Sequence, residues 1–127
     1  MTDSKIPELL AQLKELDPET YRDFREICAM TAFDSSDLDD PNITTPVYGW
    51  CLQGVIQDAI AARGWFFSLT YSSADKKSDV IIRERGFAEG REIWLLLSHI
   101  CTKGHAEALL AAYIAAREAE REAMTDG

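Results

Sequence analysis

The chain has 127 residues, of which 46% are hydrophobic and 9% aromatic, and its formal charge at pH 7 is -9. These values predict one globular domain with a core of ordinary size and argue against a disordered chain. The acidity argues against unspecific binding to DNA, RNA or anionic membranes, which requires a basic surface. The apolar runs, such as Ile93 to Leu97, are too short to span a bilayer, and residues 1–5 lack a hydrophobic signal region. We therefore expect a soluble, cytoplasmic protein.

The negative charge is concentrated near the N-terminus. Residues 1–47 hold 11 acids and 4 bases, whereas residues 48–127 hold 11 acids and 9 bases. An acidic face of this kind favours a basic protein partner. The three cysteines, Cys28, Cys51 and Cys101, form an odd and widely spaced set, which predicts buried free thiols in a reducing compartment and no disulfide.

Two short helices are predicted within residues 1–33. The apolar positions of the first are Ile6, Leu9, Leu10 and Leu13, and those of the second are Tyr21, Phe24, Ile27 and Cys28. The first helix ends near Leu16. Asp17 is a suitable N-cap for the second, with Pro18 at the permitted first position.

An acidic loop follows over residues 34–47. It has no hydrophobic periodicity and contains two prolines, which is typical of a surface loop. Its acids, Asp34, Asp37, Asp39 and Asp40, are the candidate partner-binding residues. A calcium site is the alternative, but the segment lacks the glycine and terminal glutamate of an EF-hand loop, so solvated loop acids are favoured.

Residues 48–117 are expected to form the core of the single domain. Two segments repeat apolar residues at i, i+3, i+4, i+7 and i+8, which predicts two one-faced helices. These positions are Leu52, Val55, Ile56, Ala59 and Ile60 in one helix, and Ala106, Leu109, Leu110, Tyr113 and Ile114 in the other. Gly64 is placed to end the first of them as a left-handed C-cap. Residues 118–127 are expected to extend this last helix into solvent, because they lack an apolar stripe.

Three strands are predicted between these helices. Residues 65–71 and 79–85 alternate aromatic or β-branched residues and are joined by a polar turn. Gly86 to Gly90 form the next turn. Residues 92–98 are interpreted as a third strand, with a buried helix as the alternative. Because both faces of this sheet are apolar, helices or a second subunit must cover each side. The predicted fold is α+β: a small three-stranded antiparallel sheet packed between helices, an α/β/α sandwich of element order ααα-βββ-α.

The middle and end of the chain resemble a small phage domain family, the "ABA sandwich". The likeness is carried by Tyr48-Gly49-Trp50, by Ala59-Ile60-Ala61-Ala62, by Gly64-Trp65-Phe66-Phe67-Ser68-Leu69 and by the helix from Ala106 to Tyr113. It covers roughly residues 48–117. The acidic N-terminal extension and the apolar segment 92–98 depart from the family pattern. The resemblance implies a compact α/β/α fold and a phage or prophage accessory protein, and it transfers no catalytic residue.

Few residues suggest chemistry. His99, Cys101 and His105 have the spacing H-x-C-x3-H, but a structural zinc site needs four ligands, so packing and helix-end roles are favoured. A cysteine nucleophile would pair Cys101 or Cys51 with a histidine, and no flanking glycine elbow supports it. We predict no catalytic residue, metal or cofactor, and the enzyme class is disfavoured.

A phosphate site is the candidate ligand site. Lys103 and His105 lie at the start of the last helix, where backbone N–H groups are free, and Arg83 and Arg85 share one strand face. The alternative, which we favour, is an ordinary cap by Thr102 with solvated bases. The two arginines are equally consistent with a charged strand edge.

Three functions follow from these patterns. The first is a non-enzymatic interaction protein that binds another protein through its acidic half or an exposed aromatic surface. In a phage setting, its target would be a host defence or nucleic-acid-binding factor, blocked by charge mimicry. The second is a binder of a nucleotide or phosphate through Arg83, Arg85, Lys103 and His105. The third is a homo-oligomeric structural or assembly protein, and a dimer is expected under all three.

Overall fold

The computed structural model describes residues 6–30 and 46–125 and contains four helices and three strands in those ranges. The elements are α1 (Ile6–Leu16), α2 (Pro18–Met30), α3 (Pro46–Ala62), β1 (Trp65–Ser72), β2 (Lys77–Ala88), β3 (Arg91–Thr102) and α4 (His105–Thr125). The strands form one antiparallel sheet in the order β1-β2-β3. The α+β class, the strand assignment of residues 92–98 and the element order are therefore confirmed. None of the helices in the described ranges has the length and apolarity needed to cross a membrane.

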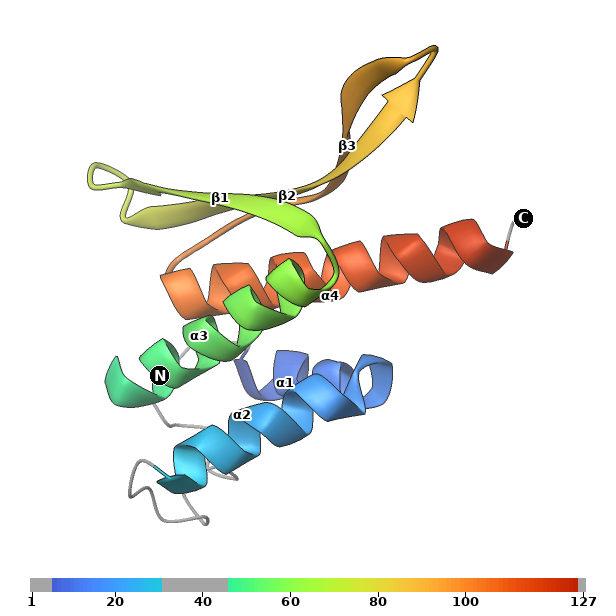
Figure 1. The fold of residues 1–127 in the computed structure, drawn as a ribbon. Coiled ribbons are helices and arrows are strands. Elements are labelled where there is room, and N and C mark those ends of the chain that lie inside the picture. Colours follow the sequence, from blue (N-terminus) through green and yellow to red (C-terminus); the bar gives the residue numbers. More distant parts are fainter. Residues whose placement is uncertain (1–5, 31–45, 126–127) are drawn as a thin grey trace.

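The elements form three layers (Figure 1). The sheet lies on α3 and α4, with β1 next to α3 and with β2 and β3 next to α4. The helices α1 and α2 pack on the opposite side of α3 and α4. The sheet thus has helical cover on one face, and among the described residues no helix lies on its other face. The N-terminal helices α1 and α2 therefore do not cover that second face.

The position of α1 and α2 follows from the buried surface of α4. The predicted apolar stripe of this helix is buried, and so are Ala108, Ala112 and Ala116, which recur at i, i+4 and i+8 outside that stripe. A helix that is apolar around more of its circumference must be buried on more than one side. Because α4 contacts the sheet, α3 and α1, it forms the centre of the core and requires the N-terminal helices as its second cover.

The helix α3 packs and ends as its sequence predicts. Leu52, Val55, Ile56 and Ile60 are buried, so the apolar stripe faces the core. Gly64 has a φ of 75°, the left-handed conformation of a C-cap glycine, and its N–H donates to the carbonyl of Ala61. The chain then enters β1 directly at Trp65.

The β2–β3 hairpin is longer than predicted. The expected turn from Gly86 to Gly90 is wrong, because β2 continues through Gly86 to Ala88 and the turn consists of Glu89 and Gly90, which both have positive φ. Gly86 pairs with Ile93, and a Cβ at this position would lie 3.4 Å from the Cδ1 of Leu95. The glycine therefore makes room for a neighbouring side chain within a regular ladder.

A bulge redirects the outer part of this hairpin. Ile82 pairs with Ser98 and Arg83 with Leu96, which leaves Leu97 as the extra residue of β3. Bulges increase the local twist and bend the strand. Beyond this point the hairpin rises away from the helices (Figure 1). We call residues 85–94, which extend past the end of β1, the hairpin arm.

Candidate functional site

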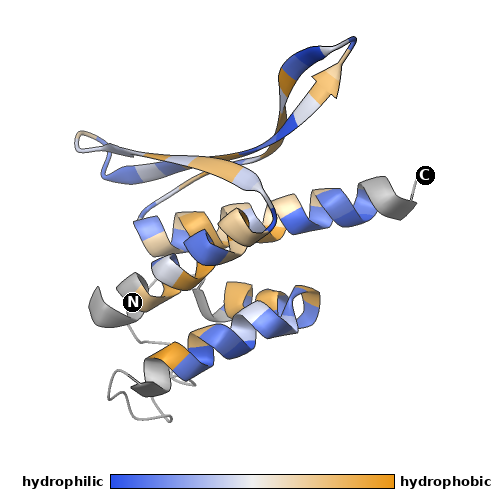
Figure 2. Ribbon diagram, viewed as in Figure 1, coloured by the Kyte–Doolittle hydropathy of each residue, from blue (hydrophilic) through white to orange (hydrophobic). Residues whose placement is uncertain are grey.

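The sheet face turned away from α3 and α4, which we call the open face, carries large exposed apolar side chains. Strand alternation and the register place Phe66, Arg83 and Leu96 in one row, Arg85 and Trp94 in the next, and Phe87 beside Glu92 in the outermost row. The exposed fractions are 47% for Phe66, 49% for Trp94, 63% for Leu96 and 73% for Phe87. In Figure 2 the projecting part of the hairpin contains hydrophobic segments (orange) between hydrophilic ones (blue). Isolated exposed apolar residues are ordinary, whereas a contiguous group of this kind makes the open face a candidate interaction site.

The open face is hollowed beside two of these aromatic rings. Phe66 and Trp94 meet edge to face, with their ring centroids 4.9 Å apart. A cavity of about 350 Å³, which we call the hollow, is lined by Phe66, Phe67, Ser68, Ile81, Arg83 and Trp94. A mostly apolar lining with one cation suits an apolar or aromatic side chain from another molecule.

The hairpin arm has little support of its own. β1 pairs with β2 only as far as Glu84. The hairpin arm beyond that residue therefore consists of β2 and β3 alone. An isolated two-stranded hairpin is marginally stable in water, and exposed apolar residues on such an element lower its solubility. Cover by another molecule would remove both costs.

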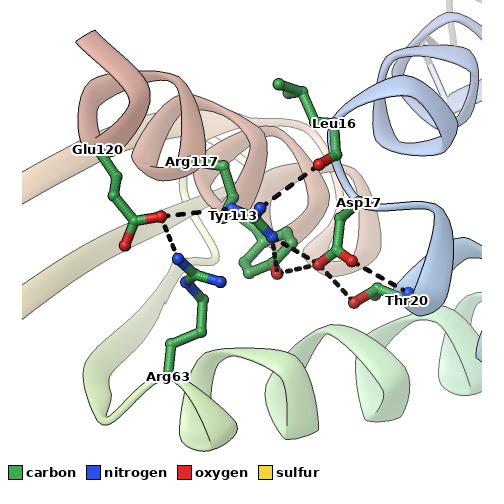
Figure 3. Close-up of polar contacts among 7 residues, drawn as sticks. All are labelled: Leu16, Asp17, Thr20, Arg63, Tyr113, Arg117 and Glu120. Carbon is green, nitrogen blue, oxygen red and sulfur yellow. Dashed lines mark hydrogen bonds and ion pairs between the residues drawn. The ribbon is translucent and has the colours of Figure 1, made fainter. Parts of the chain in front are cut away.

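A polar cluster ties the helical layers together on the other side of the molecule (Figure 3). Asp17, at the corner between α1 and α2, accepts hydrogen bonds from the backbone N–H of Thr20 at 3.3 Å and from its hydroxyl at 2.6 Å. The hydroxyl of Tyr113 donates to the same carboxylate at 2.5 Å, and the guanidinium of Arg117 lies 2.7 Å from it. Asp17 is therefore a helix cap and also the link between the N-terminal helices and α4.

The cluster continues toward the end of α3. Arg63 forms an ion pair with Glu120, which also lies 3.7 Å from Arg117. The guanidinium of Arg63 stacks over Trp65, 4.8 Å from its ring centroid. A cavity of about 660 Å³ borders the cluster, with Asp17, Arg63 and Arg117 among its lining residues. Because these charges are paired with one another, we interpret the cluster as a structural tie.

The charges of the cluster also shift its pKa values. Partial burial raises the pKa of the Asp17 carboxyl, but the hydrogen bonds from Thr20 and Tyr113 and the charge of Arg117 outweigh it and leave this pKa below its usual value. The hydrogen bond from Arg63 lowers the pKa of Glu120. Burial, followed by the hydrogen bond to Asp17, raises the pKa of Tyr113.

These shifts predict a loss of stability in acid. Because the two carboxyl pKa values are lower in the folded state, their contribution is complete above the unfolded values of about 4 and is lost as the pH falls through the folded values. In urea unfolding at pH 7 and at about pH 3, the wild type should lose more stability than Asp17→Asn. Asp75→Asn, in the exposed β1–β2 turn, should lose as much as the wild type. An equal loss in Asp17→Asn and the wild type would contradict this assignment.

No family model, curated protein or solved structure matches the chain. The phage ABA sandwich resemblance and the phage or prophage origin that it implies therefore stay predictions.

The four residues of the predicted phosphate site do not come together. Arg83 and Arg85 lie on the open face, where Arg85 is 3.6 Å from Glu92. His105 begins α4 on the opposite side of the sheet, and its Nδ1 is 2.6 Å from the hydroxyl of the buried Ser78. Since Ser78 and Arg83 are five residues apart on β2, about 16 Å separates these positions along the strand. Lys103 follows the β3 end beside Ser78, so it is also remote from the arginines. These four residues therefore do not line one pocket.

His99, Cys101 and His105, which were considered and disfavoured as metal ligands, are also divided between the two sheet faces. His99 lies on the open face, with its Nε2 2.5 Å from the carboxylate of Asp79. His105 packs edge to face on Tyr71 on the other side. Within the described residues, no group of three metal-ligating side chains is found.

The two thiols within the described side chains are free but not buried. Cys51 is half-buried and Cys101 is exposed. The prediction of burial is wrong for Cys101, because strand alternation places it on the open face beside Asp79. The side chain of Cys28 and the predicted partner-binding acids Asp34, Asp37, Asp39 and Asp40 lie outside the described residues.

Ser78 and His105 are residue types that can form a nucleophile and its base, but their position does not allow that role. The side chain of Ser78 is fully buried, so no substrate reaches its hydroxyl. Ser98 is buried in the same layer and donates to the carbonyl of Ala112 at 2.8 Å. Both serines fasten the sheet to α4, which satisfies buried polar groups.

Sequence reasoning identified an exposed aromatic surface as one possible binding site but did not locate it. The signal was present in the alternation of β2 and β3, since Arg83, Arg85 and Phe87 follow Ile81 at period two. The missing information was which face α3 and α4 cover. The polar cluster was missed entirely, because its members are distant in sequence: Tyr113 and Asp17 are 96 residues apart.

Proposed function

We propose that this chain is a non-enzymatic protein-binding protein and that it binds through the open face of its sheet. The observation that carries this proposal is the contiguous exposed group of Phe66, Trp94, Leu96 and Phe87 around the hollow. Large aromatic anchors beside a pocket, with an arginine among its lining residues, are the composition of a protein-binding hot spot.

This proposal differs from charge mimicry in the forces that it uses. Binding by an acidic surface falls steeply as salt screens the charges, whereas burial of apolar area does not. The open face carries three bases, Lys77, Arg83 and Arg85, against the acids Asp79 and Glu92, although the chain as a whole is strongly acidic. We therefore expect binding to persist when the ionic strength is raised.

The test is capture by variants of the open face. Tagged wild type and a Trp94→Ser/Leu96→Ser double variant are each expressed with an untagged copy of the chain, and native mass spectrometry identifies what each retains. The wild type should retain a stoichiometric protein, whether a cellular protein or the untagged copy, and the double variant should lose at least 10-fold of it, as expected for loss of a hot spot.

The matched control is Ile27→Ser. Ile27 is an exposed apolar residue on α2, remote from the sheet, so this variant should retain the same protein as the wild type. Equal retention by the wild type and the double variant would contradict the proposal, as would a loss with Ile27→Ser alone.

A further inference from the structure

The open face contains two features that complement each other. Phe87 is the most exposed of its large apolar side chains and stands near the tip of the hairpin arm. Arg83, one of the residues that line the hollow, lies four residues before Phe87 on β2, which is about 13 Å along the strand. One molecule thus carries a projecting phenyl ring and an apolar recess on the same surface. A two-fold symmetric interface requires this kind of self-complementary patch.

We propose that the molecule covering the open face is a second copy of this chain, with Phe87 of each copy seated in the hollow of the other. This inference rests on the proposed function and names the partner of the same surface. The proposed interface also brings opposite charges together. Glu92 lies opposite Phe87 in the register of the hairpin, so each inserted ring brings a carboxylate toward Arg83 of the other copy.

The charge of the open face favours a second copy. Two chains that each carry -9 repel one another over most of their surfaces. On the open face the bases Lys77, Arg83 and Arg85 exceed the acids Asp79 and Glu92 by one. Both signs are therefore present where identical faces meet, and a strongly basic partner would find more negative charge elsewhere on the chain.

The available area is also sufficient. An aromatic side chain buries about 150–250 Å² when covered completely. With the exposed fractions of Phe66, Trp94, Phe87 and Leu96, these four side chains offer about 500 Å² in each copy, or about 1,000 Å² in a dimer. The lower limit of specific interfaces is about 1,000 Å². The four side chains reach this area without any contribution from the polar residues around them.

Sedimentation velocity of the purified chain over a wide concentration range tests this proposal. The wild type should reach twice the 14.2 kDa of one chain. Phe87→Ser should weaken dimerisation by about 1,000-fold, because each dimer loses two anchors of about 30-fold each. Tyr71→Ser removes an exposed aromatic residue from the helix-facing side of the sheet and should leave the dimer unchanged.

Charge reversal supplies a second readout that does not depend on Phe87. Arg83→Glu and Glu92→Arg should each weaken the dimer, and the two combined should recover part of the loss, because the intermolecular pair is restored with its signs exchanged. Circular dichroism establishes that each variant is folded.

A wild type that is monomeric at every concentration would overturn the proposal that a second copy covers the open face. A dimer that Phe87→Ser does not weaken would overturn it as well. If the monomeric chain still captures another protein through Trp94 and Leu96, only the identity of the partner is wrong and the proposed function holds. If neither self-association nor capture depends on the open face, both fail.

Discussion

Replacing Asp17 by alanine is expected to lower the free energy of unfolding by about 3 kcal/mol, as for loss of one partner of a largely buried ion pair together with a helix cap. The side chains of Asp17 and Arg117 are only 14% and 19% exposed. Without Asp17, Arg117 keeps a charge with little access to water, and the hydroxyls of Thr20 and Tyr113 lose their acceptor. Urea unfolding at pH 7 measures the difference.

Two comparison variants separate the parts of this effect. Asp17→Asn keeps one acceptor oxygen at the cap but replaces the other by an NH2 group and removes the charge, so its loss of stability should be smaller than that of the alanine variant. Asp23→Ala removes an exposed acid from the same helix and should change stability by less than about 0.5 kcal/mol. A change of that size in Asp17→Ala would show that the cluster does not hold the helical layers together.

Substitution of two leucines by alanine should affect different properties, the stability of the fold in one case and binding in the other. Leu109 is fully buried on α4, whereas Leu96 is 63% exposed on the open face. Leu109→Ala should lower the free energy of unfolding by about 2–5 kcal/mol through lost contacts and a cavity, and the protein that remains folded should bind as the wild type does. Leu96→Ala should weaken binding by about 10-fold while stability at high dilution changes little.

Chemical denaturation of dilute protein and a binding titration at higher concentration give the two readouts for each variant. Dilution is needed because association stabilises the folded chain by mass action. If Leu96→Ala proved as destabilising as Leu109→Ala in dilute solution, the open face would belong to the core of the monomer and not to an interface.

The helices were predictable because each is specified by local sequence. The stripes from Leu52 to Ile60 and from Ala106 to Ile114 are buried as expected, and Gly64 ends α3 in the left-handed conformation. Asp17 was correctly predicted as a cap, since capping depends on residues within one turn. Its contacts with Tyr113 and Arg117 depend on how α1 and the corner after it pack on α4, which no local pattern contains.

The extent of the hairpin and the layer order were not predictable from the same signals. Gly86 suggested a turn because glycine usually interrupts strands, whereas here it accommodates Leu95 within the ladder. Apolar residues on both sheet faces predicted cover for both, and the structure shows helices on one of them. The layer order depends on α4, which is buried around much of its circumference and contacts the sheet, α3 and α1.

Hydroxyl-radical footprinting with mass spectrometry tests the central claim most directly, because it reports the solvent accessibility of individual side chains in the assembled state. Between dilute monomer and the assembled form, whether dimer or captured complex, modification of Phe66, Phe87, Trp94 and Leu96 should fall severalfold, as expected for anchors that become desolvated. Tyr71, exposed on the helix-facing side, should be modified equally in both. Unchanged modification of the four open-face residues in an assembly that demonstrably forms would contradict the account.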